Sequence, residues 1–199
     1  MSTADETHGA LMTAAIERDG AAQRALLAGD SRGARADFAQ SAELYRRSWE
    51  AAGPTSYGRL IGMLKAAVLA GGGEEQAAYA TEALERDESD SPAAAYARAL
   101  AALIAQDDEA ACRWAARMEG GSDAFDRTAE AIDALARRDG ARYAKAVEAI
   151  VDDFEQRADH LTGVAIADTA LMLQELAARR GIAAGIESPV LPRTAGRMF

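Results

Sequence analysis

The run from Gly29 to Gly33 reads Gly-Asp-Ser-Arg-Gly and matches the pattern G-x-S-x-G around Ser31, in which the serine can act as a nucleophile. That chemistry needs a buried strand before the serine, so that a strained turn presents its hydroxyl beside an oxyanion hole. Here the preceding residues have the pattern of a helix. His8 and His160 are the candidate bases, and neither lies in a recognisable motif. We therefore interpret Ser31 as a turn or capping residue and predict that the chain is not an enzyme.

Three consecutive glycines, Gly71 to Gly73, stand before an expected helix, where backbone amides can bind phosphate. The following Glu74 and Glu75 would repel an anion there. The lysine and the serine or threonine of a P-loop are also missing. We interpret this run as a loop and predict no cofactor.

Residues that commonly bind metals are few. Cys112 is the only cysteine, which excludes an intrachain disulfide and a cysteine cluster. His8 and His160 lack the spacing of zinc ligands, so we predict no metal site, with carboxylates that converge in the fold as the open alternative. Cys112, Trp114 and Met118 are interpreted as core residues of one helix.

Asp168 interrupts an apolar stripe, because it lies between Val164 and Leu171 at helical spacing. A carboxylate in that place needs a partner such as a hydroxyl, an arginine or a backbone amide. We interpret it as a structural residue, since an acid near the amino-terminal end of a helix is favourable. A functional role for Asp168 or His160 stays open.

Composition predicts an all-α fold. Of 199 residues, 49% are hydrophobic and 51 are alanine, which favours helices and lets them approach closely. The net charge is −10, and 20 of the 22 basic residues are arginine, so no concentrated basic face for nucleic acid is expected. The chain has neither a signal-peptide pattern nor an apolar run of the roughly 20 residues that cross a bilayer. We predict a cytoplasmic protein without membrane contact, and leave its oligomeric state open.

Helical periodicity, capping residues and glycine or proline stops predict about nine helices in a single domain of residues 1–199. Five of them are expected at residues 8–28, 31–52, 74–86, 93–106 and 162–180, and the others between these spans. Gly20 is a weak point within the first. Residues 1–7 are expected to be disordered, and residues 183–199 to form an extended tail with Ile186, Val190 and Leu191 against the last helices.

The turns recur along the chain, at Asp30, Gly72, Asp107 and Asp139, which are separated by 42, 35 and 32 residues. Such a period predicts stacked antiparallel helix hairpins that share their cores. The pattern resembles tetratricopeptide repeats, without the full tryptophan, leucine-glycine and tyrosine set. The best matches are Gly29, Asp30, Ala34 and Phe38. We predict a tetratricopeptide-like superhelix with Phe38 buried between its helices.

The part from Arg137 to Pro192 carries a second resemblance. Its residues are Arg137-Arg138-Asp139-Gly140, Tyr143 to Phe154, Ala170-Leu171-Met172-Leu173, Arg180-Gly181-Ile182 and Glu187 to Pro192. They are similar to the closing part of the immunity protein 49 family, although Val190 stands where many members carry an aromatic residue. The resemblance implies a protein that neutralises a cognate toxin by stoichiometric binding. The alternative is a tetratricopeptide-type adaptor for a partner from its own cell. The binding face is unknown in both.

Overall fold

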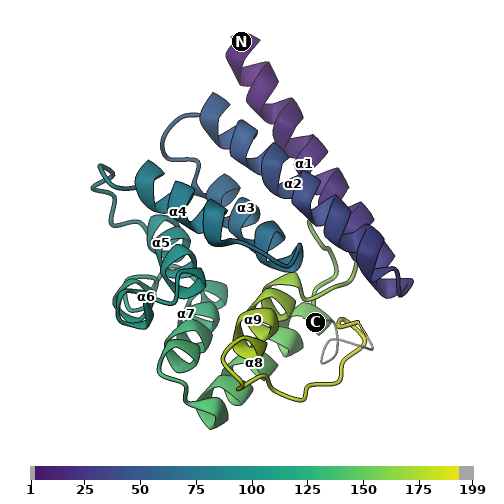
Figure 1. The fold of residues 1–199 in the computed structure, drawn as a ribbon, viewed down its shortest axis with the longest axis vertical. Coiled ribbons are helices and arrows are strands. Elements are labelled where there is room, and N and C mark those ends of the chain that lie inside the picture. The colour runs from purple at the N-terminus through teal and green to yellow at the C-terminus, as the bar shows by residue number, and fades with distance from the viewer. Residues whose placement is uncertain (1–2, 193–199) are drawn as a thin grey trace.

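The fold, given by a computed structural model, is described for residues 3–192, with side chains from residue 7 onward. Within this part of the chain all regular structure is helical, which confirms the all-α prediction (Figure 1). The nine helices are α1 (Thr3–Leu27), α2 (Ser31–Ala51), α3 (Tyr57–Leu69), α4 (Glu74–Ala83), α5 (Pro92–Ile104), α6 (Asp108–Ala115), α7 (Asp123–Ala136), α8 (Gly140–Glu155) and α9 (Asp168–Ala178).

Four equivalent turns fold the first eight helices into antiparallel hairpins. They are centred on the positions that the sequence predicts to recur, Asp30, Gly72, Asp107 and Asp139. At each, the backbone amide donates to the carbonyl five residues earlier over 2.9 to 3.1 Å, and the residue before it has a left-handed φ. The three aspartates also cap the next helix, because each carboxylate accepts from the amide three residues on. The predicted hairpin repeat is therefore confirmed.

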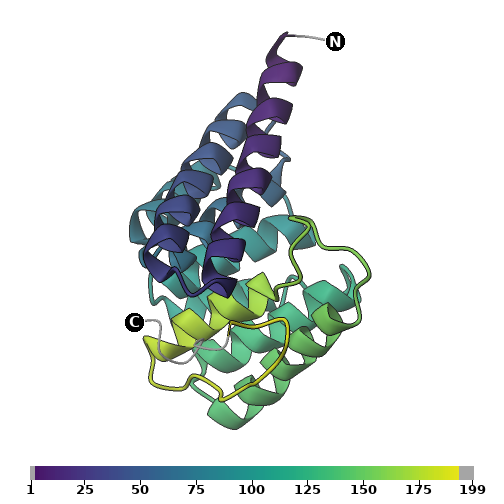
Figure 2. The same cartoon turned by 90° about the vertical axis from the view of Figure 1, so that its right-hand side faces the viewer.

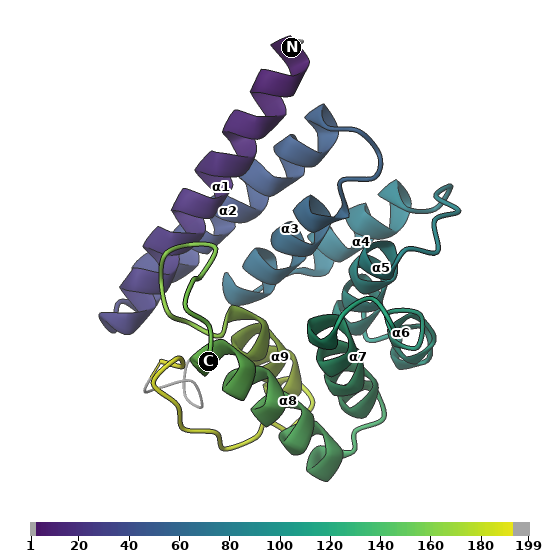
Figure 3. The ribbon, with the colours of Figure 1, turned by 180° about the vertical axis from the view of Figure 1, so that it is seen from behind.

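The hairpins follow an arc, and the last helix lies inside it. Successive hairpins meet where α2 packs on α3, α4 on α5 and α6 on α7. Helix α9 packs on α3, α7 and α8 within the arc (Figures 1 and 3). The concave side of the superhelix is thus filled by the chain's own last helix.

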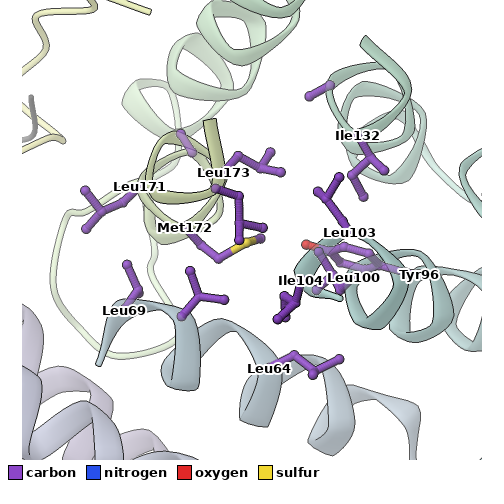
Figure 4. Close-up of a cluster of buried hydrophobic side chains, with 14 of the residues drawn as sticks. Leu64, Leu69, Tyr96, Leu100, Leu103, Ile104, Ile132, Leu171, Met172 and Leu173 are labelled. Carbon is purple, nitrogen blue, oxygen red and sulfur yellow. The ribbon is translucent and has the colours of Figure 1, made fainter. Parts of the chain in front are cut away.

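A buried apolar cluster joins α9 to the arc (Figure 4). Its members are at most 4% exposed and come from α3, α5, α7 and α9. They are Leu64, Leu69, Leu100, Leu103, Ile104, Ile132, Leu171, Met172 and Leu173. All residues from Thr169 to Ala177 are buried, so α9 is covered on every side, as in the central helix of a larger core. We call this set the apolar cluster.

Two arginines after α9 fix its carboxyl end to the turns of the arc. The Arg179 guanidinium donates to the Gly72 carbonyl over 2.9 Å and pairs with Glu74. Arg180, with a side chain only 4% exposed, donates to the Leu103 carbonyl and pairs with Asp108 over 2.8 Å. The glycine run after α3 is therefore a turn, and Arg179 binds the carboxyl end of α9 to it.

The first helix is longer than the sequence predicts. Helix α1 starts at Thr3, so residues 3–7 are helical where disorder is expected, and residues 1 and 2 lie outside the described part. The helix also passes through Gly20 without a break. A Cβ at Gly20 would lie 3.1 Å from the Thr162 carbonyl oxygen, so this glycine permits another segment to approach α1 closely.

The ninth helix begins at Asp168, and the predicted start at residue 162 is wrong. Residues 162–167 are irregular because Gly163 adopts a left-handed φ of 68° and the Ala167 amide donates to the Val190 carbonyl over 2.8 Å. The apolar residues Val164 and Ile166 are buried from this irregular segment rather than from a helix. Apart from this start and the start of α1, the ends given for the predicted helices lie within three residues of the observed ones.

The residues after α9 follow the predicted extended path as far as Pro192. Val190 and Leu191 are buried, and Ile186 packs against the core. The Ser188 hydroxyl donates to Glu155 of α8 over 2.6 Å. This tail therefore covers the last helices, while residues 193–199 of the predicted tail lie outside the described part.

Candidate functional site

A cavity of about 290 Å³ lies between the amino-terminal helices and the carboxyl-terminal part of the chain. Its walls come from α1, α2, α3, α5, α7, α8, α9 and the segment of residues 156–167. Most of the exposed wall area is apolar. Six of the polar side chains in the wall lie near one another, in two hydrogen-bonded sets with Tyr96 beside them. These are Asp19, Tyr45, Lys65, Tyr96, Asp168 and Thr169. A mainly apolar cavity with few convergent polar groups is the usual form of a binding site. We call it the polar cavity.

Lys65 of α3 and Asp168 of α9 form an ion pair inside the wall. The ammonium lies 2.6 Å from the carboxylate and also donates to the Thr169 hydroxyl over 3.0 Å. The two side chains are 17% and 26% exposed. Burial lowers the pKa of Lys65, but Asp168, Tyr96 and Asp19 together raise it by more, so the pKa lies above its ordinary value and the ammonium keeps its proton. Lys65 is therefore the partner that a carboxylate in an apolar stripe needs.

Asp19 of α1 is held by Tyr45 of α2. The Tyr45 hydroxyl donates to one carboxylate oxygen over 3.0 Å. The tyrosine ring lies directly on α3, because a Cβ at Gly62 would come within 2.8 Å of it. Burial raises the pKa of Asp19 to about 6, against the lowering effect of the Ser41 and Tyr45 hydroxyls. Near neutral pH this site therefore holds a desolvated carboxylate.

Several polar atoms of the cavity wall are sealed from solvent without a normal hydrogen bond. They are the second carboxylate oxygen of Asp19, the Tyr96 hydroxyl and Nδ1 of His160. Tyr96 is only 8% exposed, and although Thr169 lies near its hydroxyl, no hydrogen bond of normal geometry joins them. Leaving a buried polar group unpaired costs about 1 to 3 kcal/mol. Such atoms therefore mark a place where a bound group can supply the missing contacts.

A second polar set lies where α7, α8 and residues 156–167 meet. The Arg127 guanidinium is 2.6 Å from Asp153, and Arg157 donates to the same carboxylate over 3.0 Å. The Arg157 guanidinium also lies 3.8 Å above the Phe154 ring, whose other neighbour is His160 at 6.2 Å between ring centroids. The two arginines and Asp153 are paired with one another, and with Phe154 they hold the carboxyl end of α8 to the following segment.

The segment of residues 156–167 lines one side of the polar cavity. Figure 2 shows that it leaves α8, approaches α1 and returns to α9. The Thr162 hydroxyl donates to the side chain of Gln23 on α1, beside the close approach at Gly20. This wall therefore depends on Gly20 in α1 and on the irregular path of residues 156–167.

The structure does not assemble the serine chemistry considered from the sequence. Ser31 is the first residue of α2, and it follows a helix, while Asp30 provides the cap. His8 lies near the opposite end of α2, where its carbonyl accepts from Ser48. His160 lines the polar cavity instead. These three side chains therefore belong to separate regions.

The three residues predicted to share a core differ in burial. Met118 is fully buried, whereas Cys112 and Trp114 are half-buried against the core. The Trp114 ring lies between two guanidinium groups, with Arg98 at 4.8 Å and Arg117 at 5.0 Å from its centroid. Met118 is therefore a core residue, but it lies in the turn after α6, which ends at Ala115, whereas Cys112 and Trp114 lie in α6 without full burial. The prediction of three core residues on one helix is wrong in these respects.

Within the described residues, no group of three or more histidine, cysteine or acidic side chains is placed to hold a metal ion. In the same part of the chain, no helix combines the length and the apolar character needed to cross a bilayer.

Sequence reasoning found only Asp168 and His160 among the polar residues of the cavity. It missed Asp19, Lys65 and Tyr96, which come from three helices distant in sequence. Lys65 carried a usable signal, because it is one of two lysines in an arginine-rich chain and stands in an apolar run. Asp19 and Tyr96 carried none, since each fits an ordinary helical pattern.

Comparison with models of known protein families, with curated proteins and with solved structures finds no match for this chain. The resemblance of Arg137 to Pro192 to an immunity family therefore stays a prediction from its own residues.

Proposed function

We propose that this chain is a non-catalytic binding domain that captures a protein partner in stoichiometric amounts, with the polar cavity as its central contact. The observation that carries the proposal is the pair of sealed, unpaired oxygens on Asp19 and Tyr96 within a mainly apolar cavity. A partner group that enters the cavity would gain both apolar burial and hydrogen bonds.

The arrangement of α9 favours this cavity over the concave groove of the superhelix. Tetratricopeptide-like domains can hold a peptide in such a groove, but here α9 occupies it with nine consecutive buried residues. An adaptor of that type would first have to displace the apolar cluster. The polar cavity needs no such rearrangement.

We further propose that the partner is a toxin, which the chain neutralises. The resemblance of Arg137 to Pro192 supports this, and that stretch contributes α8, residues 156–167 and the start of α9 to the cavity wall. The net charge of −10 suits a basic target, because complementary charge speeds association.

The test is co-expression with the product of a neighbouring toxic gene, followed by purification of the complex. We expect relief of toxicity in proportion to the complex formed, and a fixed stoichiometry in light scattering. Gly58→Leu should abolish the complex, because Gly58 lines the cavity at an exposed position where a Cβ meets no atom within 4 Å, so a leucine there would stand at the edge of the cavity and obstruct a partner. Gly9→Leu is the matched control, at a helical glycine with equally free surroundings outside the cavity wall.

Relief of toxicity without a complex, or by traces of the chain, would contradict capture. A complex that survives Gly58→Leu would show that the cavity is not the contact. A stable complex with a harmless protein of the same cell, and none with a toxin, would favour the adaptor alternative.

A further inference from the structure

We infer that the polar cavity accepts a primary ammonium group on a short aliphatic stem, presented either by a free alkylamine or by a lysine side chain. This inference rests on the proposed function, in which the cavity is a binding site. It goes further by assigning the chemistry of the group that enters.

The unpaired atoms of the cavity define what the incoming group must offer. The second oxygen of the Asp19 carboxylate can only accept a hydrogen bond, and the Tyr96 hydroxyl can also accept one. An ammonium group carries three donors and no acceptor, so it suits such a set. Tyr96, sealed at 8% exposure, gives the site an oxygen that solvent does not reach.

The charges nearest Asp19 also favour a cation. Asp168 adds a second negative charge there and Lys65 a positive one, and all three interact electrostatically. Arg127 and Arg157 line the same cavity, and both pair with Asp153. Lys65 is already engaged, since it lies 2.6 Å from Asp168 and donates to Thr169. The Asp19 carboxylate accepts from the neutral Tyr45 hydroxyl and lies beside the neutral Ser41 hydroxyl. A second ammonium would balance the charges of Asp19, Asp168 and Lys65.

The size and the wall of the cavity limit the rest of the ligand. A volume of about 290 Å³ is at the lower limit of ligand sites, which span about 300 to 1,000 Å³, and suits one side chain or a small amine rather than a large cofactor. The wall near the polar group includes Ile61, Phe125 and Ile150. These side chains can pack against a four-carbon stem.

Glycines on α3 keep this space open. Gly58 and Gly62 stand one helical turn apart on α3, and both line the cavity. Gly62 leaves room for the Tyr45 ring, while Gly58 borders free space. Larger side chains at these positions would displace the tyrosine that holds Asp19 or would obstruct the edge of the cavity.

The experiment compares n-butylamine, 1-butanol and butyrate as probes for the purified full chain, by calorimetry and by shifts of methyl resonances from Ile61 and Ile150. The three have similar size and differ in charge. We expect n-butylamine to bind about tenfold more tightly than 1-butanol, as for a hydrogen bond to a charged group, and butyrate to bind least. Asp19→Asn should remove the preference for the amine, and Asp152→Asn on the exposed side of α8 is the matched control.

Equal binding of n-butylamine and 1-butanol, tighter binding of butyrate, or an unchanged preference in Asp19→Asn would overturn the ammonium assignment. Failure of all three probes to bind would overturn it as well. None of these results removes the cavity as a protein contact, which the effect of Gly58→Leu on the complex tests separately.

A second arm distinguishes the two sources of the ammonium. Lysine with acetylated amino and methylamidated carboxyl ends carries the same stem as n-butylamine. Binding at least as tight as that of n-butylamine would identify a protein lysine as the source. Binding of n-butylamine alone would identify a free amine. Either result supports the ammonium assignment, and binding of neither probe refutes it.

Discussion

The apolar cluster and the polar cavity share helices α3, α5, α7 and α9 and differ in the side chains that these helices bury. Helix α3 places Leu64 in the cluster and Lys65 in the cavity wall, and α9 turns from Asp168 to Leu171 within one helical turn. The cluster is apolar and almost fully buried, whereas the cavity wall contains buried polar atoms without normal hydrogen bonds. Binding sites commonly contain buried polar atoms whose hydrogen bonds are incomplete.

On the proposed function, the residues of the apolar cluster stabilise the fold, and those of the polar cavity bind the partner. Burial on all sides makes α9 a central support, and the two arginines at its carboxyl end secure it to the arc. The first turn of the same helix then holds Asp168 beside Lys65 with little freedom. A rigid helix therefore positions the polar group better than a loop would.

The largest effect is expected in the apolar cluster. Leu171→Ala removes a side chain that is 0% exposed, and the surrounding helices cannot close the resulting space fully. We expect a loss of about 3 to 5 kcal/mol in the free energy of unfolding from urea denaturation. A loss below about 1 kcal/mol would mean that α9 does not support the arc.

A smaller effect is expected from breaking the ion pair of the cavity. Lys65→Met leaves Asp168 unpaired near Asp19, and we expect it to lower the free energy of unfolding by about 2 to 3 kcal/mol. Asp168→Asn should act in the same direction. The double variant should lose clearly less than both single losses combined, because the two groups compensate each other. Additive losses in urea denaturation would show that the pair is not coupled.

The repeat and its core could be predicted from local sequence. Glycine and aspartate turns lie at the predicted positions, because their geometry depends on a few neighbouring residues. Phe38 is 1% exposed, as its spacing from Asp30 predicts. Few other side chains could replace the small and aromatic residues on such a face and keep the helices packed.

The cavity could not be predicted in the same way, because its contacts join distant parts of the chain. Lys65 reaches Thr169 across 104 residues, and no local pattern specifies that pairing. The apolar stripe through Val164 suggested a continuous helix, while the glycine at residue 163 and a backbone bond to Val190 produced an irregular wall. Tertiary contacts there override helix propensity.

The raised pKa of Asp19 predicts how stability depends on pH. Its value of about 6 in the folded chain exceeds the ordinary 3.8, so the folded state binds this proton more tightly than the unfolded state. Asp19 therefore lowers stability as the pH rises from about 4 to about 7. The charged and titratable groups that face it are Tyr45 on α2, Lys65 on α3 and Asp168 on α9.

The most direct test measures stability and n-butylamine affinity on the same Asp19→Asn protein. At pH 7 we expect the variant to be about 1 to 2 kcal/mol more stable than the natural chain, with the gain vanishing near pH 4. Its affinity for n-butylamine should fall about tenfold. Opposite changes in stability and affinity would support a cavity that keeps an unpaired carboxylate for binding. A variant that is less stable at pH 7 and binds the amine as well as the natural chain would contradict it.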